Sequence, residues 1–252
     1  MTSEEIVSRL LYRDGLMLVI DKPAGIAVHR GPNGGESLED AFDALRFGLP
    51  RRPALAHRLD RDTSGCLVLG RHRKALALLG KLFKSGVIAK TYWAVVEGAP
   101  ETDEGVIELP LGRLDVTRGW WMKHDPSGQA AVTKWRVLGR AADRAGTLFT
   151  WLALEPLTGR THQLRVHCAE MGWPILGDAI YGNAPRHGGA PLHLHAREIK
   201  IPLHKNRAPI TVTAPVPPHM RTALAQCGWE AQSEHAHYIA SRWEQSEAAQ
   251  AS

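Results

Sequence analysis

Short apolar runs bounded by turn-forming residues predict most of the regular structure of this chain. The run at 16–20 is closed by Pro23 and Gly25, which predicts a buried strand followed by a turn. The run at 66–69 predicts a second buried strand. Runs rich in β-branched and aromatic residues, each bounded by glycine or proline, predict further strands at 91–96, 131–138, 148–154, 191–201 and 210–213. Strands therefore dominate the second half of the chain.

Three segments show the spacing of amphipathic helices. From Leu38 the apolar positions recur at i, i+3, i+4 and i+7, and Ser37 is placed to cap the first turn, which predicts a helix of about ten residues. The segment 74–84 predicts a helix with one apolar and one cationic face that ends before Gly86. A third helix is predicted over 161–171, between two glycines.

The sequence shows no internal repeat, and no Ser/Gly-rich or Pro-rich linker divides it. We therefore expect one domain over 1–229, followed by a polar, acidic and partly disordered tail over 230–252. A length of 252 residues with 44% hydrophobic and 23% charged residues is ordinary for a globular protein with a sizeable core. This composition excludes collagen-like, disulfide-dense and mainly disordered chains.

The sequence contains no recognisable membrane span or secretory signal. The apolar runs at 16–20 and 66–69 are far shorter than the roughly 20 residues needed to cross a bilayer. The N-terminal segment includes Glu4, Glu5 and Asp14, so it lacks the basic and then apolar order of a secretory signal. The three cysteines have no metal-type spacing and suit a reducing compartment. We therefore expect a cytoplasmic protein.

Positive charge is concentrated in one part of the chain. The net charge is +5, and the segment 45–90 holds eleven Lys and Arg against two acids, Asp60 and Asp62. Such a density suggests a polyanionic partner, because neutralising phosphates releases condensed counterions. A solvated lysine-rich helix face is the other interpretation, and charge alone does not separate the two.

The segment 57–65, with the sequence HRLDRDTSG, is the first candidate for chemistry. Asp60 lies between Arg58 and Arg61, and nearby positive charge favours the carboxylate form that nucleophilic attack requires. The alternative is that Asp60 or Asp62 only bonds backbone amides of the Thr-Ser-Gly turn. We favour that alternative for Asp62 and leave it open for Asp60.

The segment 158–167, with the sequence TGRTHQLRVH, is the second candidate. A helix N-terminus with Arg160 beside it forms an anion site, and Arg165 lies one turn further along the helix. A glycine at a loop-to-helix junction is also commonplace, and Arg165 could be a surface charge.

These two segments resemble the RluA family of pseudouridine synthases. The segment 57–65 resembles the family's HRLDxxTSG signature, and 158–167 resembles its TGRxHQ(L/I)RVH segment. The opening segments 11–14 and 21–25, the Lys-x-Tyr strand at 90–92, and the segments 172–178 and 192–196 match the family in the same order. The resemblance therefore covers most of the chain, from Leu11 to Thr213.

The resemblance implies an enzyme that isomerises a uridine in RNA without a cofactor. By the same resemblance, Asp60 is the catalytic carboxylate, Arg165 pairs with Asp60, Tyr92 stacks on the uracil, and Arg58 enters the base stack that the flipped uridine leaves. The fold implied is α+β: a mixed, largely antiparallel sheet flanked by helices, with the active cleft across its middle.

The expected RNA contacts are cationic or polar side chains near these segments, and we expect no metal site. The contacts are Arg58, Arg61, Arg73, Lys74, Lys81, Lys84, Arg160 and His162. For Trp120 and Trp121 we favour packing over base stacking. His193 and His195 could ligate a metal together with His162 or Cys168, but no carboxylate or cysteine stands at a supporting interval.

Few residues precede the opening segment, so we expect no N-terminal S4-type module and recognition by the catalytic domain itself. This favours a compact stem-loop in ribosomal RNA or tRNA, bound by a monomer. Two other functions remain: a non-catalytic RNA-binding protein, and a hydrolase with Asp60 as covalent nucleophile. The mass of the product distinguishes the hydrolase from the isomerase, because hydrolysis adds water whereas pseudouridine has the mass of uridine.

Overall fold

A long twisted sheet organises the part of the chain that the computed structural model describes, residues 1–31, 34–115 and 121–231. The spatial order of its main path is β1-β2-β4-β11-β5-β10-β9-β6, with β3 paired to β4 and β12 paired to β11. Its strands are β1 Leu10–Arg13, β2 Met17–Lys22, β3 Ala54–Leu55, β4 Ser64–Gly70, β5 Ala89–Glu97, β6 Glu104–Glu108, β9 Val132–Ala142, β10 Leu148–Pro156, β11 Leu194–Ile201 and β12 Ile210–Thr213. A small separate sheet pairs β7 Leu111–Arg113 with β8 Met122–His124.

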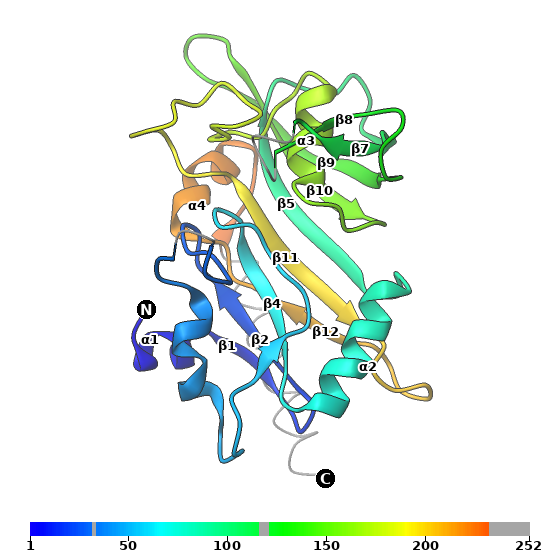
Figure 1. Cartoon of the computed structure of the whole chain (residues 1–252). Helices are drawn as coiled ribbons and strands as arrows, with labels where there is room; N and C mark the ends of the chain where they lie inside the picture. The colour runs from blue at the N-terminus through cyan, green and yellow to red at the C-terminus, as the bar shows by residue number, and fades with distance from the viewer. Residues whose placement is uncertain (32–33, 116–120, 232–252) are drawn as a thin grey trace.

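Short helices flank the sheet. They are α1 Ser3–Ser8, η1 Leu38–Leu45, α2 Arg73–Lys84, α3 Gln163–Glu170 and α4 Pro218–Gln226. In Figure 1, β1, β2 and β4 lie at the lower left with α1, whereas β9, β10 and α3 lie at the upper right; β11 and β5 run between the two halves. The predicted α+β class with a mixed, largely antiparallel sheet is confirmed, because among the strands of the described residues β4 and β11 are the one parallel pair.

The parallel contact between β4 and β11 marks the middle of the sheet. It covers only two residue pairs, His195 with Ser64 and Ala196 with Gly65, after which β12 takes over as the partner of β11. Gly65 has a φ of +104°, and a Cβ there would collide with the Ala196 backbone. Glycine is therefore required where the loop before β4 enters the sheet. Ala196 also pairs with Tyr92 of β5, so this loop and Tyr92 lie close together.

Two apolar clusters cover one face of the sheet and leave a boundary between them. One joins Leu18, Ile20 and Leu67 to η1, and the other joins β5 and β10 to α3. Tyr92 packs against both clusters. The boundary between the two halves of the core therefore lies at Tyr92.

The predicted strands all form, and the helices at 74–84 and 161–171 correspond to α2 and α3. The segment at 38–45 is a 3₁₀-helix instead of the expected longer helix. Its apolar positions are buried as predicted, but spacing over two turns fits either winding, so the pattern did not distinguish them. The elements α1, β1, β3, β6, the β7–β8 pair and α4 were not predicted. The expected acidic tail lies, from residue 232 on, outside the described residues.

The described helices are all too short or too polar to cross a membrane.

Candidate active site

The structure brings the three predicted catalytic residues to one cavity. Asp60 precedes β4, Tyr92 lies on β5 and Arg165 lies on α3, and all three line a cavity of about 560 Å³. The two segments that stood out in the sequence, 57–65 and 158–167, form much of its wall. The cavity lies where the two halves of the core meet, at Tyr92.

A buried lysine anchors the loop that carries Asp60. Lys22, at the end of β2, is fully buried and its Nζ donates hydrogen bonds to the backbone oxygens of Pro23, Arg61 and Thr63 at 2.8–2.9 Å. Burial lowers the pKa of Lys22 to about 8. In addition, a hydrogen bond between backbone groups, from the Gly25 N–H to the Arg61 oxygen, ties the loop to the turn after β2. The loop is therefore held directly after Asp60, at Arg61 and Thr63.

A glutamine fixes the loop on the opposite wall of the cavity. The Gln163 Oε1 accepts hydrogen bonds from the Thr158 hydroxyl at 2.7 Å and the Arg160 N–H at 3.0 Å. Its Nε2 donates to the Val132 oxygen and the Thr133 hydroxyl of β9, both at 3.0 Å. The start of α3 is thereby fastened to the sheet.

Arg165 does not form the expected direct pair with Asp60. Its Nε and Nη2 each donate to one carboxylate oxygen of Asp178 at 2.7 Å, and both side chains are buried. Within the described residues no ion pair shorter than 4.0 Å joins Arg165 to Asp60, although the two interact electrostatically. The reason is geometric: the bidentate pair holds the guanidinium against Asp178, and in that position it lies more than 4.0 Å from the Asp60 carboxylate.

The side chain of His162 lies beside Asp60. Its Nε2 lies 3.8 Å from Oδ1 of Asp60, and its Nδ1 lies 2.8 Å from the Tyr181 hydroxyl. That hydroxyl accepts the N–H of Met122 at 2.9 Å, which favours its own proton pointing to Nδ1 and the Nε2–H tautomer of the histidine. Burial lowers the pKa of His162 against the opposing effect of Asp60, so the imidazole is neutral near neutral pH.

His162 also has unusual backbone geometry. Its φ of 52° and ψ of 18° lie in the left-handed region, which non-glycine residues seldom occupy. Such a conformation persists only when its surroundings enforce it, and it is most frequent at functional sites. It directs the buried imidazole of His162 into the cavity instead of outward to surface RNA.

Tyr92 supplies a neutral aromatic wall. Burial, reinforced by the negative charge of Asp60, raises the pKa of Tyr92 far above its usual range. The phenol therefore stays protonated at neutral pH. Its ring lies between the two apolar clusters, in position to contact a planar group that enters beside Asp60.

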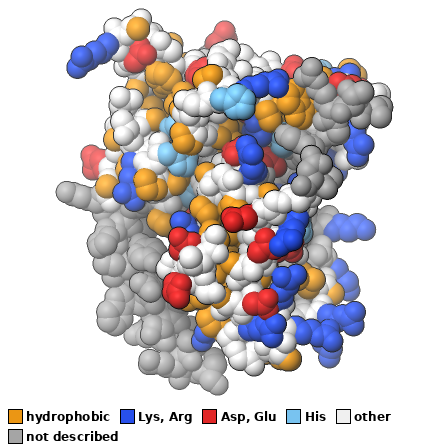
Figure 2. Space-filling model, turned by 60° about the vertical axis from the view of Figure 1, so that its left-hand side comes forward, with side chains coloured by type: hydrophobic (Ala, Val, Ile, Leu, Met, Phe, Trp, Pro, Cys, Tyr) orange, Lys and Arg blue, Asp and Glu red, His pale blue; other side chains and the backbone are white. Residues whose placement is uncertain are grey.

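The expected RNA-binding cations separate into three groups. Arg58, Lys84 and Arg160 line the cavity, and Arg61 lines a neighbouring one. The exposed face of α2 carries the remaining three, Arg73, Lys74 and Lys81. On the face shown in Figure 2, Lys and Arg side chains gather toward the lower right, whereas acidic side chains are scattered across the centre.

The structure also shows the surroundings of Asp62, Trp121 and His195. Asp62 does not bond backbone amides of the turn but pairs with the Arg61 side chain at 3.1 Å, so the interpretation favoured for it was wrong. Trp121 lies beneath the Arg186 guanidinium at 5.1 Å, while Trp120 lies outside the described residues. His195 bonds the Ser64 hydroxyl at 2.9 Å. In the described ranges no three His, Cys, Asp or Glu side chains are grouped as metal ligands.

Asp178, Tyr181 and Lys22 were missed as site residues by reasoning from local sequence. Asp178 follows Gly177 in a loop, which by itself is typical of a turn. Lys22 ends an apolar strand where a surface charge is the usual interpretation. Their roles depend on partners between 13 and 59 positions away, such as Arg165 and Met122, which no local pattern indicates.

The comparisons with known proteins identify the family of this chain. The sequence profile described as RNA pseudouridylate synthase matches residues 16–170. A protein of Zymomonas mobilis named as an uncharacterized RNA pseudouridine synthase is 42% identical over 214 residues, which cover 84% of this chain and 95% of that protein. The ribosomal large subunit pseudouridine synthase C of Haemophilus ducreyi is 34% identical over 229 residues, 88% of this chain and 70% of that one.

A solved structure supports the same relationship. The human RNA Pseudouridylate Synthase Domain Containing 4 has a TM-score of 0.74 and 26% identity, and the match covers 90% of this chain and 96% of that one. The match to the family profile and the relatives named as RNA pseudouridine synthases confirm the resemblance to the RluA-type enzymes, which are isomerases that act on RNA. This chain belongs to the RNA pseudouridylate synthase family.

Proposed function

We propose that this chain converts a specific uridine of a structured RNA to pseudouridine, with Asp60 as the catalytic carboxylate. The observation that carries the proposal is the convergence of Asp60, Tyr92 and Arg165, from three distant segments, on one cavity. A carboxylate beside a neutral aromatic ring and a buried guanidinium suits attack on a ribose carbon or assistance to base departure. The uracil then rotates and rejoins the sugar through carbon, with no change in mass.

Arg165 acts on Asp60 through its field and not through a direct bond. Because Asp178 holds the guanidinium in a bidentate pair, the positive charge stays fixed near Asp60 while both Asp60 oxygens remain available to the substrate. A preorganised charge of this kind stabilises charge that develops during a reaction without reorganisation. We assign Asp178 as a positioning residue for Arg165.

The target uridine must leave its base stack to reach the cavity. Flipping a nucleotide costs a few kcal/mol, least where pairing is already weak, so a loop of a stem-loop is the favoured location. Arg58 is exposed at the cavity, and its planar guanidinium suits the gap that the uridine leaves. Lys84, Arg160 and the cationic face of α2 would hold nearby phosphates without reading sequence.

We infer large-subunit ribosomal RNA as the substrate, with tRNA as the alternative that the test can return. The inference is supported by relatives that are 34% identical and named ribosomal large subunit pseudouridine synthase C. The experiment is carbodiimide-based mapping of pseudouridines in cells that lack the protein. A single lost site identifies the RNA.

The same cells test the role of Asp60 by reintroduction of the wild-type protein or of a variant. Reintroduced wild-type protein is expected to restore the lost site, and an Asp60→Asn variant at equal abundance is not. Restoration by Asp60→Asn would remove Asp60 from the mechanism. An unchanged pseudouridine map in the deletion strain would favour the non-catalytic RNA-binding function, and a product heavier by one water would favour the hydrolase.

A further inference from the structure

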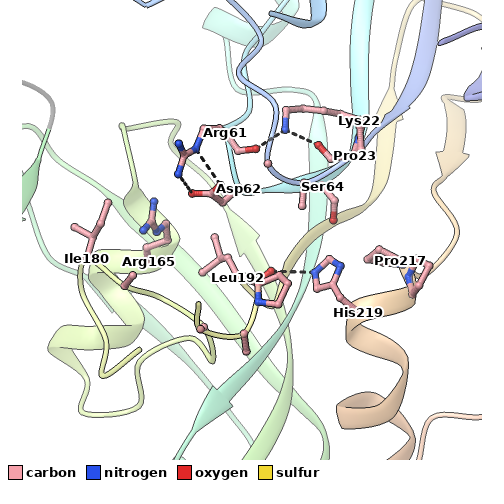
Figure 3. Close-up of a pocket in the computed structure, with 18 of the residues that line it drawn as sticks. Lys22, Pro23, Arg61, Asp62, Ser64, Arg165, Ile180, Leu192, Pro217 and His219 are labelled. Carbon is pink, nitrogen blue, oxygen red and sulfur yellow. Dashed lines mark hydrogen bonds and ion pairs between the residues drawn. The ribbon is translucent and has the colours of Figure 1, made fainter. Parts of the chain in front are cut away.

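A second and larger cavity adjoins the one that holds Asp60. It has a volume of about 870 Å³, within the range of cavities that bind small ligands. Arg165 and Ile180 lie on one side of it, and His219 and Pro217 lie on the other (Figure 3). Nothing in the reaction proposed above uses this space.

The two cavities share one wall. Arg165 lines both of them, and the segment 60–64 separates them, with Asp60 and Thr63 facing one cavity and Asp62 and Ser64 facing the other. For a chain molecule with one unit beside Asp60, the larger cavity is therefore the adjoining space across the segment 60–64.

The larger cavity has a cationic lining. Its lining residues include five arginines and one lysine against two aspartates, and those aspartates already pair with Arg61 at 3.1 Å and Arg9 at 3.5 Å. Arg186 stacks on Trp121, and Arg221 donates from Nε to the Val216 oxygen. Both guanidiniums are exposed, and in the described part of the chain neither has a carboxylate partner. Two arginines are thus available to an anion.

Much of the remaining lining is apolar and rich in proline. Six prolines contribute to it, at positions 23, 185, 191, 215, 217 and 218, together with Ile180 and Leu192. His219 donates from Nε2 to the Leu192 oxygen at 3.1 Å, and burial lowers its pKa, so near neutral pH its Nδ1 is an acceptor. Proline-rich apolar walls with the His219 acceptor suit a planar heterocycle, whereas the arginines suit phosphate.

We propose that this cavity binds a nucleotide adjacent to the target uridine in the RNA strand. Its base lies against the prolines and Leu192, and its phosphate contacts the cationic rim of Arg186 and Arg221. The proposal rests on the proposed function, since it takes the strand that enters beside Asp60 to be RNA. It assigns to the larger cavity a part in selecting the sequence around the target.

The first test measures binding of pentauridylate. The double variant Arg186→Glu, Arg221→Glu is expected to weaken binding by about tenfold or more, and to lower the slope of log affinity against log salt by about one to two, as for two lost phosphate contacts. The control is Arg51→Glu, Arg144→Glu, which makes the same charge change at exposed positions that line neither cavity. Equal weakening in both double variants would overturn the proposal, because the effect would then be general charge.

The second test locates the strand. Pentauridylate with one 4-thiouridine is irradiated with the wild-type protein, and adducts are mapped by mass spectrometry. One position of the 4-thiouridine in the oligonucleotide is expected to give adducts with residues of the Asp60 cavity. The neighbouring position is expected to give adducts in 185–191 or 215–221. Adducts confined to the Asp60 cavity would overturn the proposal. Equal loss of uridine monophosphate binding in the double variant would also overturn it, since the cavity would then take free mononucleotides.

Tritium release from RNA labelled at uracil C5 separates this proposal from the proposed function. Release by the wild-type protein without adducts in the larger cavity removes only the adjacent-nucleotide site. Adducts there without release support the site and remove the isomerase reaction.

Discussion

Arg165 and Asp178 form a buried bidentate ion pair, with Nε and Nη2 each 2.7 Å from one carboxylate oxygen. Burial alone would raise the pKa of Asp178, but the guanidinium and backbone amides bring it below its usual value. The same carboxylate accepts the N–H groups of Ile180 and Tyr181. One aspartate therefore fixes both the arginine beside Asp60 and the loop that carries Tyr181.

Breaking this pair on one side is expected to be costly. Asp178→Asn leaves a buried guanidinium without its counter-charge and should lower the free energy of unfolding by about 3–5 kcal/mol, measured by urea denaturation. The double change Arg165→Met, Asp178→Leu should be closer to the wild type in stability, because neither member of the pair then leaves an unpaired buried charge, but it should be inactive in tritium release. Full activity of the double variant would show that the pair has no part in the reaction.

Asp60→Asn is expected to abolish turnover while the fold and RNA binding persist. A loss of about 1000-fold or more, equivalent to ~4 kcal/mol of transition-state stabilisation, should appear in tritium release from labelled RNA. Asp62→Asn is the matched control, two residues away and paired only with Arg61, and should stay within a few-fold of the wild type. A similar loss in both variants would point to disruption of the loop.

Tyr92 is expected to act through its ring. Tyr92→Ala should weaken substrate binding by about 1–3 kcal/mol, the contribution of one base stacked on an aromatic side chain. Tyr92→Phe should bind RNA like the wild type, so any fall in its kcat reports the hydroxyl alone. Binding by fluorescence anisotropy and single-turnover tritium release give the two quantities; strong binding by Tyr92→Ala would contradict stacking.

The hydrogen bond between Tyr181 and His162 is expected to set the histidine tautomer. Tyr181→Phe removes the hydroxyl that faces Nδ1, so the nitrogen shifts of His162 should move away from the Nε2–H form in ¹⁵N NMR. Loss of the bond to Met122 N–H should also cost about 1–3 kcal/mol of stability. Unchanged nitrogen shifts would show that another group holds the tautomer.

Asp21 is expected to give stability a pH dependence of unusual sign. Burial, against the charges of Arg9 and Lys22, raises its pKa from 3.8 to about 6. Between these values the folded protein keeps a proton that the unfolded chain has released, so stability falls as pH rises from about 4 to about 6. Asp21→Asn should lack this fall and gain up to ~3 kcal/mol relative to the wild type near neutral pH.

The measurement for Asp21 is urea denaturation at a series of pH values. Asp43→Asn is the control, because that carboxylate is exposed and pairs only with Arg46. Parallel curves for Asp21→Asn and the wild type would show that Asp21 does not titrate in this range.

Apolar runs bounded by turn residues predicted the strands β2, β4, β5, β9, β10, β11 and β12, and helical spacing predicted α2 and α3, because burial of one face imposes its period on the chain. The Leu38 segment shows the limit of that argument: its buried positions were right, but its 3₁₀ winding was not predicted. The elements α1 and α4 are short, and their stability comes from packing of Ile6, Met220 and Leu224, not from a long periodic pattern.

By itself the sequence determined that Asp60 has arginine neighbours, that a glycine loop opens the helix of Arg165, and that the order of these segments matches the RNA pseudouridylate synthases. Only the tertiary structure decided that Arg165 pairs with Asp178, that His162 faces Asp60, and that a second cavity adjoins the first. The reason is physical: local patterns record which face of an element is buried, whereas an ion pair or a cavity depends on the distance between elements, which packing of the whole chain sets.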